Sequence, residues 1–191
     1  MYSETEGTGS LRTKTIGAVG EIAEGEEAIT GLAREGHMAI LIGETIGHLG
    51  QSALLAEVFN RVEGDAPPVD LEAEKKHGEF IRANCAWITA CSDLSDGGLA
   101  LAAFEMAEAA NIGVSLDAEG TAELFGEDQA RYLVACNFDQ AEALLAAAGN
   151  LGIPATCVGR FGGTQVSFGA QVAELSELSS IFRNSFAEAV T

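Results

Sequence analysis

The stretch WITACSDLSDGG, residues 87–98, runs from apolar residues through a polar loop to a pair of glycines. Its first five residues are mostly apolar or β-branched, which predicts a buried strand. Residues 99–110 then predict a helix almost surrounded by protein, because Glu105 and Glu108 are its only charged residues. A buried strand that leads directly into a buried helix is typical of a layered α/β domain.

The segments on either side of this stretch add further strands. Residues 38–42 (MAILI) form a continuous apolar run that ends at Gly43, as expected of a strand buried on both faces. Further strands are expected at residues 113–116, 131–136, 156–159 and 165–168. The last two suit a hairpin-like pair around Gly162-Gly163.

Helices are predicted between these strands from apolar spacing and capping residues. They are expected from Ser52 to Val62, from the cap Asp70 to about Asn84, over residues 99–110, as a short turn at 122–125, from the cap Asn137 to Leu151, and along the apolar stripe from Val172 to Val190. Strands alternate with helices until two strands follow one another near the end. We therefore predict an α+β fold, with three α/β/α layers around a mixed sheet.

The composition restricts the classes of partner. The 191 residues include 29 acidic and 10 basic ones, for a formal net charge of −19. This charge repels nucleic-acid phosphates and anionic lipids, so we expect neither nucleic acid nor membrane as a partner. No segment approaches the roughly 20 apolar residues of a membrane span, and the first residues do not resemble a secretory signal. A cytoplasmic protein is expected, with its four cysteines as buried thiols rather than disulfides.

Residues 1–37 are rich in Gly, Glu and Thr and show little periodicity. We interpret them as the end of a preceding domain and a linker, with a short strand at residues 15–19, and residues 38–191 as one lobe. A disordered tail is the alternative for the first ten residues.

The loop from Asp93 to Gly98 contains the residue types best suited to binding a ligand. Its carboxylates suit a hard cation such as Mg²⁺, which commonly bridges to nucleotide phosphates. Its glycines and the free N–H groups of the helix start suit an anion. The alternative is that Asp96 or Ser95 caps the helix and the glycines make the turn. The residues alone do not decide between these two interpretations.

Two other loops are candidate sites. Residues 43–52 join a strand to a helix through three glycines, which is a general phosphate-accepting shape, but they lack the endings of the known nucleotide-binding loops. A structural turn is the alternative. Residues 124–131 place Glu127, Asp128 and Gln129 before a buried strand, where side chains can gather at a sheet edge. An ordinary acidic loop is the alternative there.

Taken together, these loops resemble the C-terminal domain of the aminoimidazole ribonucleotide synthetase superfamily. The patterns are GETxGxLGxS at residues 43–52, xDxSDGGL at residues 92–99 and LFxExxxR at residues 124–131. Within the superfamily they are most similar to the phosphoribosylformylglycinamidine synthases, also named formylglycinamide ribonucleotide amidotransferases. Residues 2–7 and 15–20 resemble the tail of the domain that precedes this lobe in the family.

The resemblance implies an ATP-dependent carbon–nitrogen ligase of purine biosynthesis. Such an enzyme converts formylglycinamide ribonucleotide and glutamine-derived ammonia into the amidine, and it uses ATP and Mg²⁺. The implied partners are the remaining domains, a glutaminase subunit, a small accessory subunit and the ribonucleotide substrate. The family's catalytic histidine belongs to another domain, so no catalytic residue is assigned here and we expect the lobe to be inactive by itself.

The resemblance also implies roles for individual residues. Asp93 matches a position that binds Mg²⁺, and Ser95, with Gly97 and Gly98, matches a nucleotide-binding segment. Residues 127–129 (Glu127, Asp128 and Gln129) correspond to a substrate-binding stretch through the internal pseudo-twofold symmetry of the family.

Two departures from the family pattern stand out. Ser92 replaces a usual histidine, so a role taken from that histidine does not transfer, and residues 11–15 replace a proline-containing run. Two other functions stay open at this point. One is a structural or regulatory module with a resident nucleotide, and the other is a lobe of a selenophosphate synthetase or a hydrogenase-maturation protein.

Overall fold

A computed structural model describes residues 4–5, 8–9, 17, 19 and 28–189 of the chain. These residues form a seven-stranded sheet with the order β4-β6-β3-β7-β5-β8-β9. Its strands are β3 (Met38–Ile42), β4 (Ala90–Asp93), β5 (Val114–Leu116), β6 (Tyr132–Cys136), β7 (Ala155–Phe161), β8 (Gln165–Phe168) and β9 (Gln171–Glu174). A separate antiparallel pair joins β1 (Glu4–Thr5) to β2 (Thr8–Gly9).

The sheet is mixed, as predicted. Neighbouring strands are antiparallel except β5 and β8, which are parallel. Strands β3 and β4 both pair antiparallel with β6, which lies between them. The carboxyl ends of β3 and β4 therefore lie at the same edge of the sheet as the start of β6.

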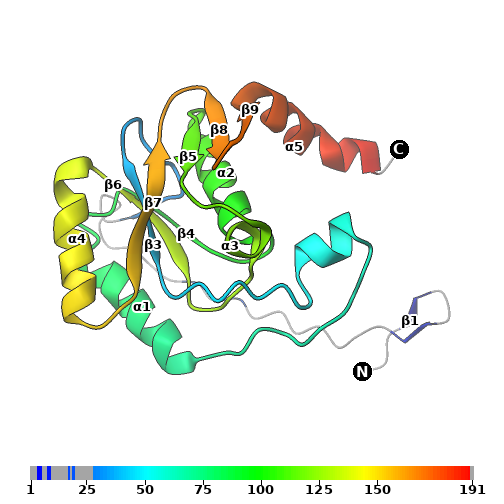
Figure 1. Ribbon diagram of the computed structural model, residues 1–191, viewed down its shortest axis with the longest axis horizontal. Helices are drawn as coiled ribbons and strands as arrows, with labels where there is room; N and C mark the ends of the chain where they lie inside the picture. Colours follow the sequence, from blue (N-terminus) through cyan, green and yellow to red (C-terminus); the bar gives the residue numbers. More distant parts are fainter. Residues whose placement is uncertain (1–3, 6–7, 10–16, 18, 20–27, 190–191) are drawn as a thin grey trace.

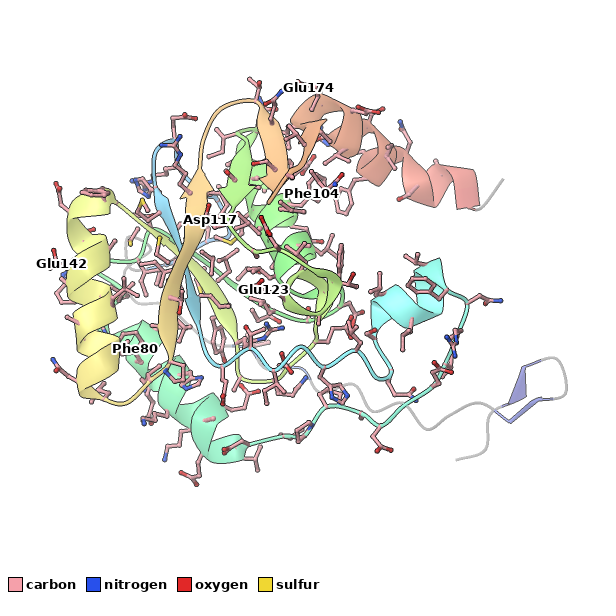
Figure 2. The ribbon with its side chains drawn as sticks, viewed as in Figure 1. Phe80, Phe104, Asp117, Glu123, Glu142 and Glu174 are labelled. Atoms are coloured by element: carbon pink, nitrogen blue, oxygen red, sulfur yellow. The ribbon has the colours of Figure 1, made fainter. Side chains whose placement is uncertain are left out.

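Helices cover both faces of the sheet (Figure 1). One face carries α1 (Leu71–Ala83) and α4 (Phe138–Asn150), and the other carries α2 (Gly98–Ala110), α3 (Thr121–Phe125) and α5 (Leu175–Ala189). Figure 2 shows Phe80 of α1 and Phe104 of α2 on opposite sides of the strands. The predicted three-layer α+β architecture is confirmed.

Strand β3 is buried on both faces, as its apolar run predicted. Ala39 and Leu41 belong to the hydrophobic cluster under α2, whereas Ile40 and Ile42 belong to the cluster under α1 and α4. Because side chains alternate along a strand, a central strand with helices on both faces has no solvent-facing side.

Two predicted helix caps are also confirmed. The Asp70 carboxylate accepts the N–H groups of Glu72 and Ala73, each at 3.0 Å. The Asn137 side chain accepts the N–H of Gln140 at 3.1 Å. Both caps satisfy helix-start N–H groups that have no partner within the helix.

The helix predicted from Ser52 to Val62 is wrong. Only one π-helical turn forms, η2 (Leu54–Val58), and none of its residues is buried. Asn60 takes a left-handed backbone conformation with φ of 51° directly after the turn. An amphipathic helix draws most of its stability from packing. Within the described lobe, Leu54 and Leu55 of this apolar stripe are only partly buried, and Val58, Phe59 and Val62 are exposed.

The predicted hairpin of residues 156–168 is also wrong, because β5 lies between β7 and β8. The connecting turn encloses Gly113, whose N–H donates to the Gly163 carbonyl at 2.8 Å. A Cβ atom at Gly113 would lie 2.2 Å from the Gln165 carbonyl oxygen. The local turn signal was correct, but it could not show that a third strand enters between the two.

The structure corrects two smaller expectations. Strand β4 begins three residues after the predicted start at Trp87, because the Trp87 and Ile88 N–H groups bond back to Asn84 and Cys85 and close the turn after α1. Val172 lies in β9 rather than in the final helix. The strand expected at residues 15–19 falls largely outside the described residues.

The described helices and the cysteines also bear on the expectations from composition. In the described part of the chain, no helix combines the length and apolar character needed to cross a bilayer. All four cysteines are free thiols, as expected, but only Cys136 is buried, and Cys85 is exposed. Burial raises the pKa of Cys136, in the centre of the sheet, to about 11, and the nearby Cys157 adds to this shift.

The enclosure of α2 can be tested at Phe104, which is 8% exposed and packs edge-to-face against Phe182. Phe104→Ala should lower the free energy of unfolding by about 3–5 kcal/mol, because it leaves a cavity in the core. Leu151→Ala, at a residue that is 57% exposed, should change it by less than about 0.5 kcal/mol. Urea denaturation measures both, and equal midpoints for the two variants would place α2 on the surface.

Candidate functional site

Three loops that are far apart in the sequence meet at one edge of the sheet. Residues 43–53 follow β3, residues 94–97 follow Asp93 at the end of β4, and residues 126–131 precede β6. Their meeting follows from the strand directions, since β6 lies between β3 and β4 and runs against both. These are the three loops that the sequence singled out as candidate sites.

Asp128 holds the first loop. Its carboxylate accepts three successive backbone N–H groups, from Ile46 at 3.0 Å, Gly47 at 2.9 Å and His48 at 3.1 Å. The side chain is buried, with a relative exposure of 5%. A carboxylate enclosed by three backbone donors is satisfied within the protein, and it fixes the path of the loop after β3.

Arg131 is the buried cation beside this carboxylate. Its guanidinium lies 3.8 Å from the Asp128 carboxylate and also donates to the Thr45 hydroxyl at 3.1 Å and to the Gly126 carbonyl. Burial lowers the pKa of Arg131, and the charge of Asp128 opposes this shift. A buried charge with a counter-charge and several acceptors is compatible with the folded state, whereas an unpaired one is not.

Glu127 joins the first loop to the second. One carboxylate oxygen of Glu127 accepts both the Ala53 N–H and the Gly97 N–H, each at 2.8 Å. Gly97 immediately precedes α2, so this carboxylate occupies the place where a helix start attracts an anion.

Helix α1 fixes the third loop through Ala130, which has a left-handed backbone with φ of 57°. The Ala130 N–H donates to the Glu74 carboxylate at 2.8 Å, and its carbonyl lies 2.7 Å from Nδ1 of His77. Gly43 passes so close that a Cβ atom there would lie 2.5 Å from the same carbonyl oxygen. Both backbone groups of this strained residue are thus held by α1.

The loop after β4 presents exposed polar groups beyond a buried anchor. Leu94 is buried, and its N–H bonds to the Arg131 carbonyl at 3.0 Å, whereas Asp93 and Ser95 are exposed. The Gly98 N–H bonds to the Ser95 carbonyl at 3.0 Å. The N–H groups of both glycines therefore have acceptors within the protein, and the side chains of Asp93 and Ser95 face solvent.

Asp93 could contribute one ligand to a metal ion. Its charge raises the pKa of Glu105, after the larger effect of burial, so the two carboxyl groups share one electrostatic neighbourhood. Within the described ranges, no group of three His, Cys, Asp or Glu residues could hold a metal. A single exposed carboxylate fits Mg²⁺ that keeps waters and phosphate oxygens as its other ligands, but not an ion held by protein alone.

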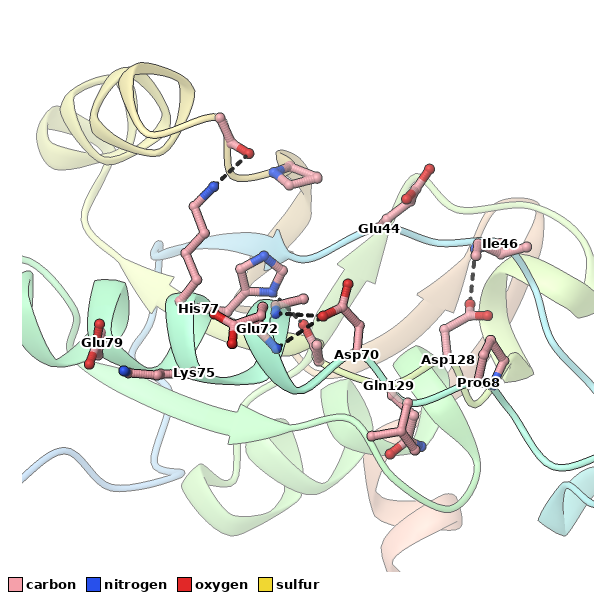
Figure 3. Close-up of a pocket in the computed structure, with 16 residues that line it drawn as sticks. Glu44, Ile46, Pro68, Asp70, Glu72, Lys75, His77, Glu79, Asp128 and Gln129 are labelled. Atoms are coloured by element: carbon pink, nitrogen blue, oxygen red, sulfur yellow. Dashed lines mark hydrogen bonds between the residues drawn. The ribbon is translucent and has the colours of Figure 1, made fainter.

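A cavity of about 790 Å³ lies between α1 and the loops after β3 and before β6 (Figure 3). Its wall carries the carboxylates of Glu44, Asp70, Glu72, Glu79 and Asp128, the cations of Lys75 and Lys76, and His77, Gln129, Ile46, Pro68, Val69, Ala73, Ala130, Gly152 and Pro154. The acidic groups outnumber the lysines, so the cavity favours cations or anions that arrive with a metal ion.

The predicted site residues thus fall into two groups. Asp128 and Gln129 line the cavity, whereas Glu127, Asp93, Ser95 and the two glycines do not. The sequence placed Glu44 within a candidate loop and Asp70 at a helix cap, but it did not indicate that α1 contributes side chains to a cavity. The ligand roles of both groups stay predictions.

The role of Asp128 in holding the loop can be tested directly. Asp128→Ala should lower the free energy of unfolding by about 3–5 kcal/mol, because it leaves the buried Arg131 charge without its partner. Amide exchange at Ile46, Gly47 and His48 should accelerate in the same variant. Glu142→Ala, on the exposed side of α4, serves as the control. Unchanged exchange at all three amides would contradict this role.

Comparison with known proteins places this geometry in a family. The family described as AIR synthase related protein, C-terminal domain, matches residues 34–170. Over its full length the chain is 67% identical to the phosphoribosylformylglycinamidine synthase subunit PurL of Ruegeria sp. (strain TM1040) and 64% identical to that of Roseobacter denitrificans. The chain spans only 26% of the length of these curated relatives.

Solved structures share the fold. T. maritima PurL complexed with FGAR superposes with a TM-score of 0.68 at 18% identity, covering 81% of this chain and 30% of that one. The protein tt0281 from Thermus thermophilus gives a TM-score of 0.53 at 20% identity, covering 76% of this chain and 53% of that one. From the strand order, the three joined loops and the match over residues 34–170, the chain belongs to the family of AIR synthase related proteins, C-terminal domain.

Proposed function

We propose that this chain is the C-terminal lobe of a phosphoribosylformylglycinamidine synthase, an ATP-dependent ligase of purine biosynthesis. The observation that carries the proposal is the 67% identity, over the whole chain, to a protein of that name. The same identity disfavours a selenophosphate synthetase or a hydrogenase-maturation protein. The remaining domains, a glutaminase subunit and a small accessory subunit complete the proposed enzyme.

The proposed reaction forms one carbon–nitrogen bond. The terminal phosphoryl group of ATP is transferred to the amide oxygen of formylglycinamide ribonucleotide, which leaves ADP. Ammonia released from glutamine then attacks the activated carbon, and phosphate departs with the former amide oxygen. The products are the amidine, ADP and phosphate. No residue of this lobe is assigned to the bond-forming steps.

Within this function, the loop after β4 is the proposed nucleotide contact. Asp93 would hold Mg²⁺, which neutralises phosphate charge when bound, and Ser95 would bind the nucleotide from the same exposed surface. A phosphate that reached the N–H of Gly97 would have to replace the Glu127 carboxylate, whereas the Gly98 N–H is held by the Ser95 carbonyl. Backbone contacts at these glycines therefore require a local rearrangement.

The cavity beside α1 is the proposed binding site for the ribonucleotide substrate, which carries a phosphate group. Gln129 and Asp128 belong to its wall, and Lys75 and Lys76 are the cations it offers. Because Asp128 is already held by three backbone N–H groups, its part is to shape the cavity. Gln129 is exposed, so its side-chain amide can contact a ligand.

The prediction that this lobe is inactive without the other domains can be tested by measuring amidine formation. The complete gene product should form the amidine from formylglycinamide ribonucleotide, ATP and ammonium, whereas residues 1–191 alone should not. Ion-pair chromatography of the ribonucleotides provides the readout. Sustained turnover by the isolated lobe would overturn the assignment of catalysis to the other domains.

Asp93 can be tested by calorimetric titration of residues 1–191 with ADP and Mg²⁺. Asp93→Ala should weaken binding about tenfold or more, because loss of a metal ligand or its support typically costs this much. Asp96→Ala is the matched control, since Asp96 is an exposed carboxylate of the same loop, and it should bind like the unmodified chain. Equal affinities for all three proteins would remove Asp93 from any nucleotide role.

A further inference from the structure

The segment of residues 50–65, here named the 50–65 loop, leaves the lobe and returns to the same point. The Gln51 N–H donates to the Glu63 carbonyl at 3.0 Å, and the Gln51 side-chain amide donates to the Gly64 carbonyl at 2.8 Å. The imidazole Nε2 of His48 lies 2.8 Å from the Asp65 carbonyl oxygen. Side-chain and backbone bonds therefore fasten the two ends of the loop together.

Glycine makes this close approach possible. A Cβ atom at Gly50 would lie 2.4 Å from the Asp65 carbonyl oxygen, and one at Gly64 would lie 2.9 Å from the Gly50 Cα atom. Gly64 also has a φ of 81°, which side chains rarely allow. On the lobe side, the bond from the Ala53 N–H to Glu127 fixes the start of the loop. The base of the loop is thus constrained by backbone as well as by side-chain contacts.

This loop exposes three of its large apolar side chains to solvent. Val58, Phe59 and Val62 are 67%, 56% and 80% exposed. Figure 1 shows the turn that carries the first of them, in cyan, standing away from the sheet. Single exposed apolar residues are common, but three within five positions on a constrained loop are typical of a contact surface.

The charges around these residues indicate the chemistry of the partner. The loop contains three acidic residues, Glu57, Glu63 and Asp65, and its one arginine, Arg61, forms an ion pair with Glu63 at 2.7 Å. The loop therefore combines exposed apolar side chains with a net negative charge, and it complements an apolar surface that carries basic residues. A second copy of this chain, with a net charge of −19, is a poor match for it.

We infer that the 50–65 loop docks Val58, Phe59 and Val62 onto another domain of the full-length polypeptide, in an apolar recess with basic residues at its edge. The length of the relatives supports this occupant, since the chain spans only 26% of them and three quarters of their sequence lies in other parts of the molecule. The inference rests on the proposed function in one respect, that the chain is one lobe of a longer enzyme.

Thiol labelling of the complete gene product tests the inference. Phe59→Cys and Val62→Cys are prepared singly, with Leu151→Cys as the matched control, because Leu151 is 57% exposed and Phe59 56%. Each is treated with a maleimide, and peptide mass spectrometry gives the rate at every cysteine, with the exposed native Cys85 as internal reference. Positions 59 and 62 should react about tenfold or more slowly than position 151, because labelling would require the interface to open.

Three other labelling outcomes overturn the inference. Equal rates at positions 59, 62 and 151 mean that the surface is free. Protection that appears only with rising protein concentration assigns it to a second copy, and protection lost when a copurifying protein is removed assigns it to a separate partner. Ligase activity of the same preparation distinguishes the docking surface from the proposed function. An active enzyme with rapid labelling at position 59 refutes the docking surface alone. An inactive enzyme in which position 59 is protected refutes the proposed function alone.

Discussion

The arrangement of the three loops at the candidate site depends on the interactions of the buried Asp128 carboxylate. It satisfies three backbone N–H groups of the loop after β3 and faces the buried guanidinium of Arg131 at the start of β6. In an interior of low polarity, neither charge would be tolerated without the other. The pair therefore makes the two loops adopt one common arrangement, and the nearby Glu127 extends that arrangement to the start of α2.

This dependence gives a structural role to two of the acidic residues where the three loops meet. Asp128 and Glu127 bind the protein's own backbone and are largely unavailable to a ligand, whereas Asp93 and Ser95 remain exposed at the same edge. The cavity beside α1 carries more carboxylates than lysines. A phosphate compound thus meets a negative surface, and a divalent cation is the simplest means of reconciling the two.

Much of the fold could be predicted from local pattern. The run at residues 38–42 predicted a doubly buried strand, and Asp70 and Asn137 predicted helix starts, because burial and capping depend on residues close in sequence. The helix at residues 52–62 could not be judged in this way. Its apolar stripe was real, but whether a stripe folds as a helix depends on a surface to pack against, and no residue of the turn that forms there is fully buried in the described lobe.

The sequence by itself determined the layered mixed-sheet fold, the family and the three loops that carry its polar residues, since all of these are recorded in spacing and residue type. The tertiary structure alone decided how the loops are used. It assigned Glu127 and Asp128 to backbone N–H groups more than 70 residues away, and it placed β5 between the two strands of the expected hairpin. The physical reason is that a carboxylate's partners and a strand's neighbours are set by strand order and direction, which no local pattern contains.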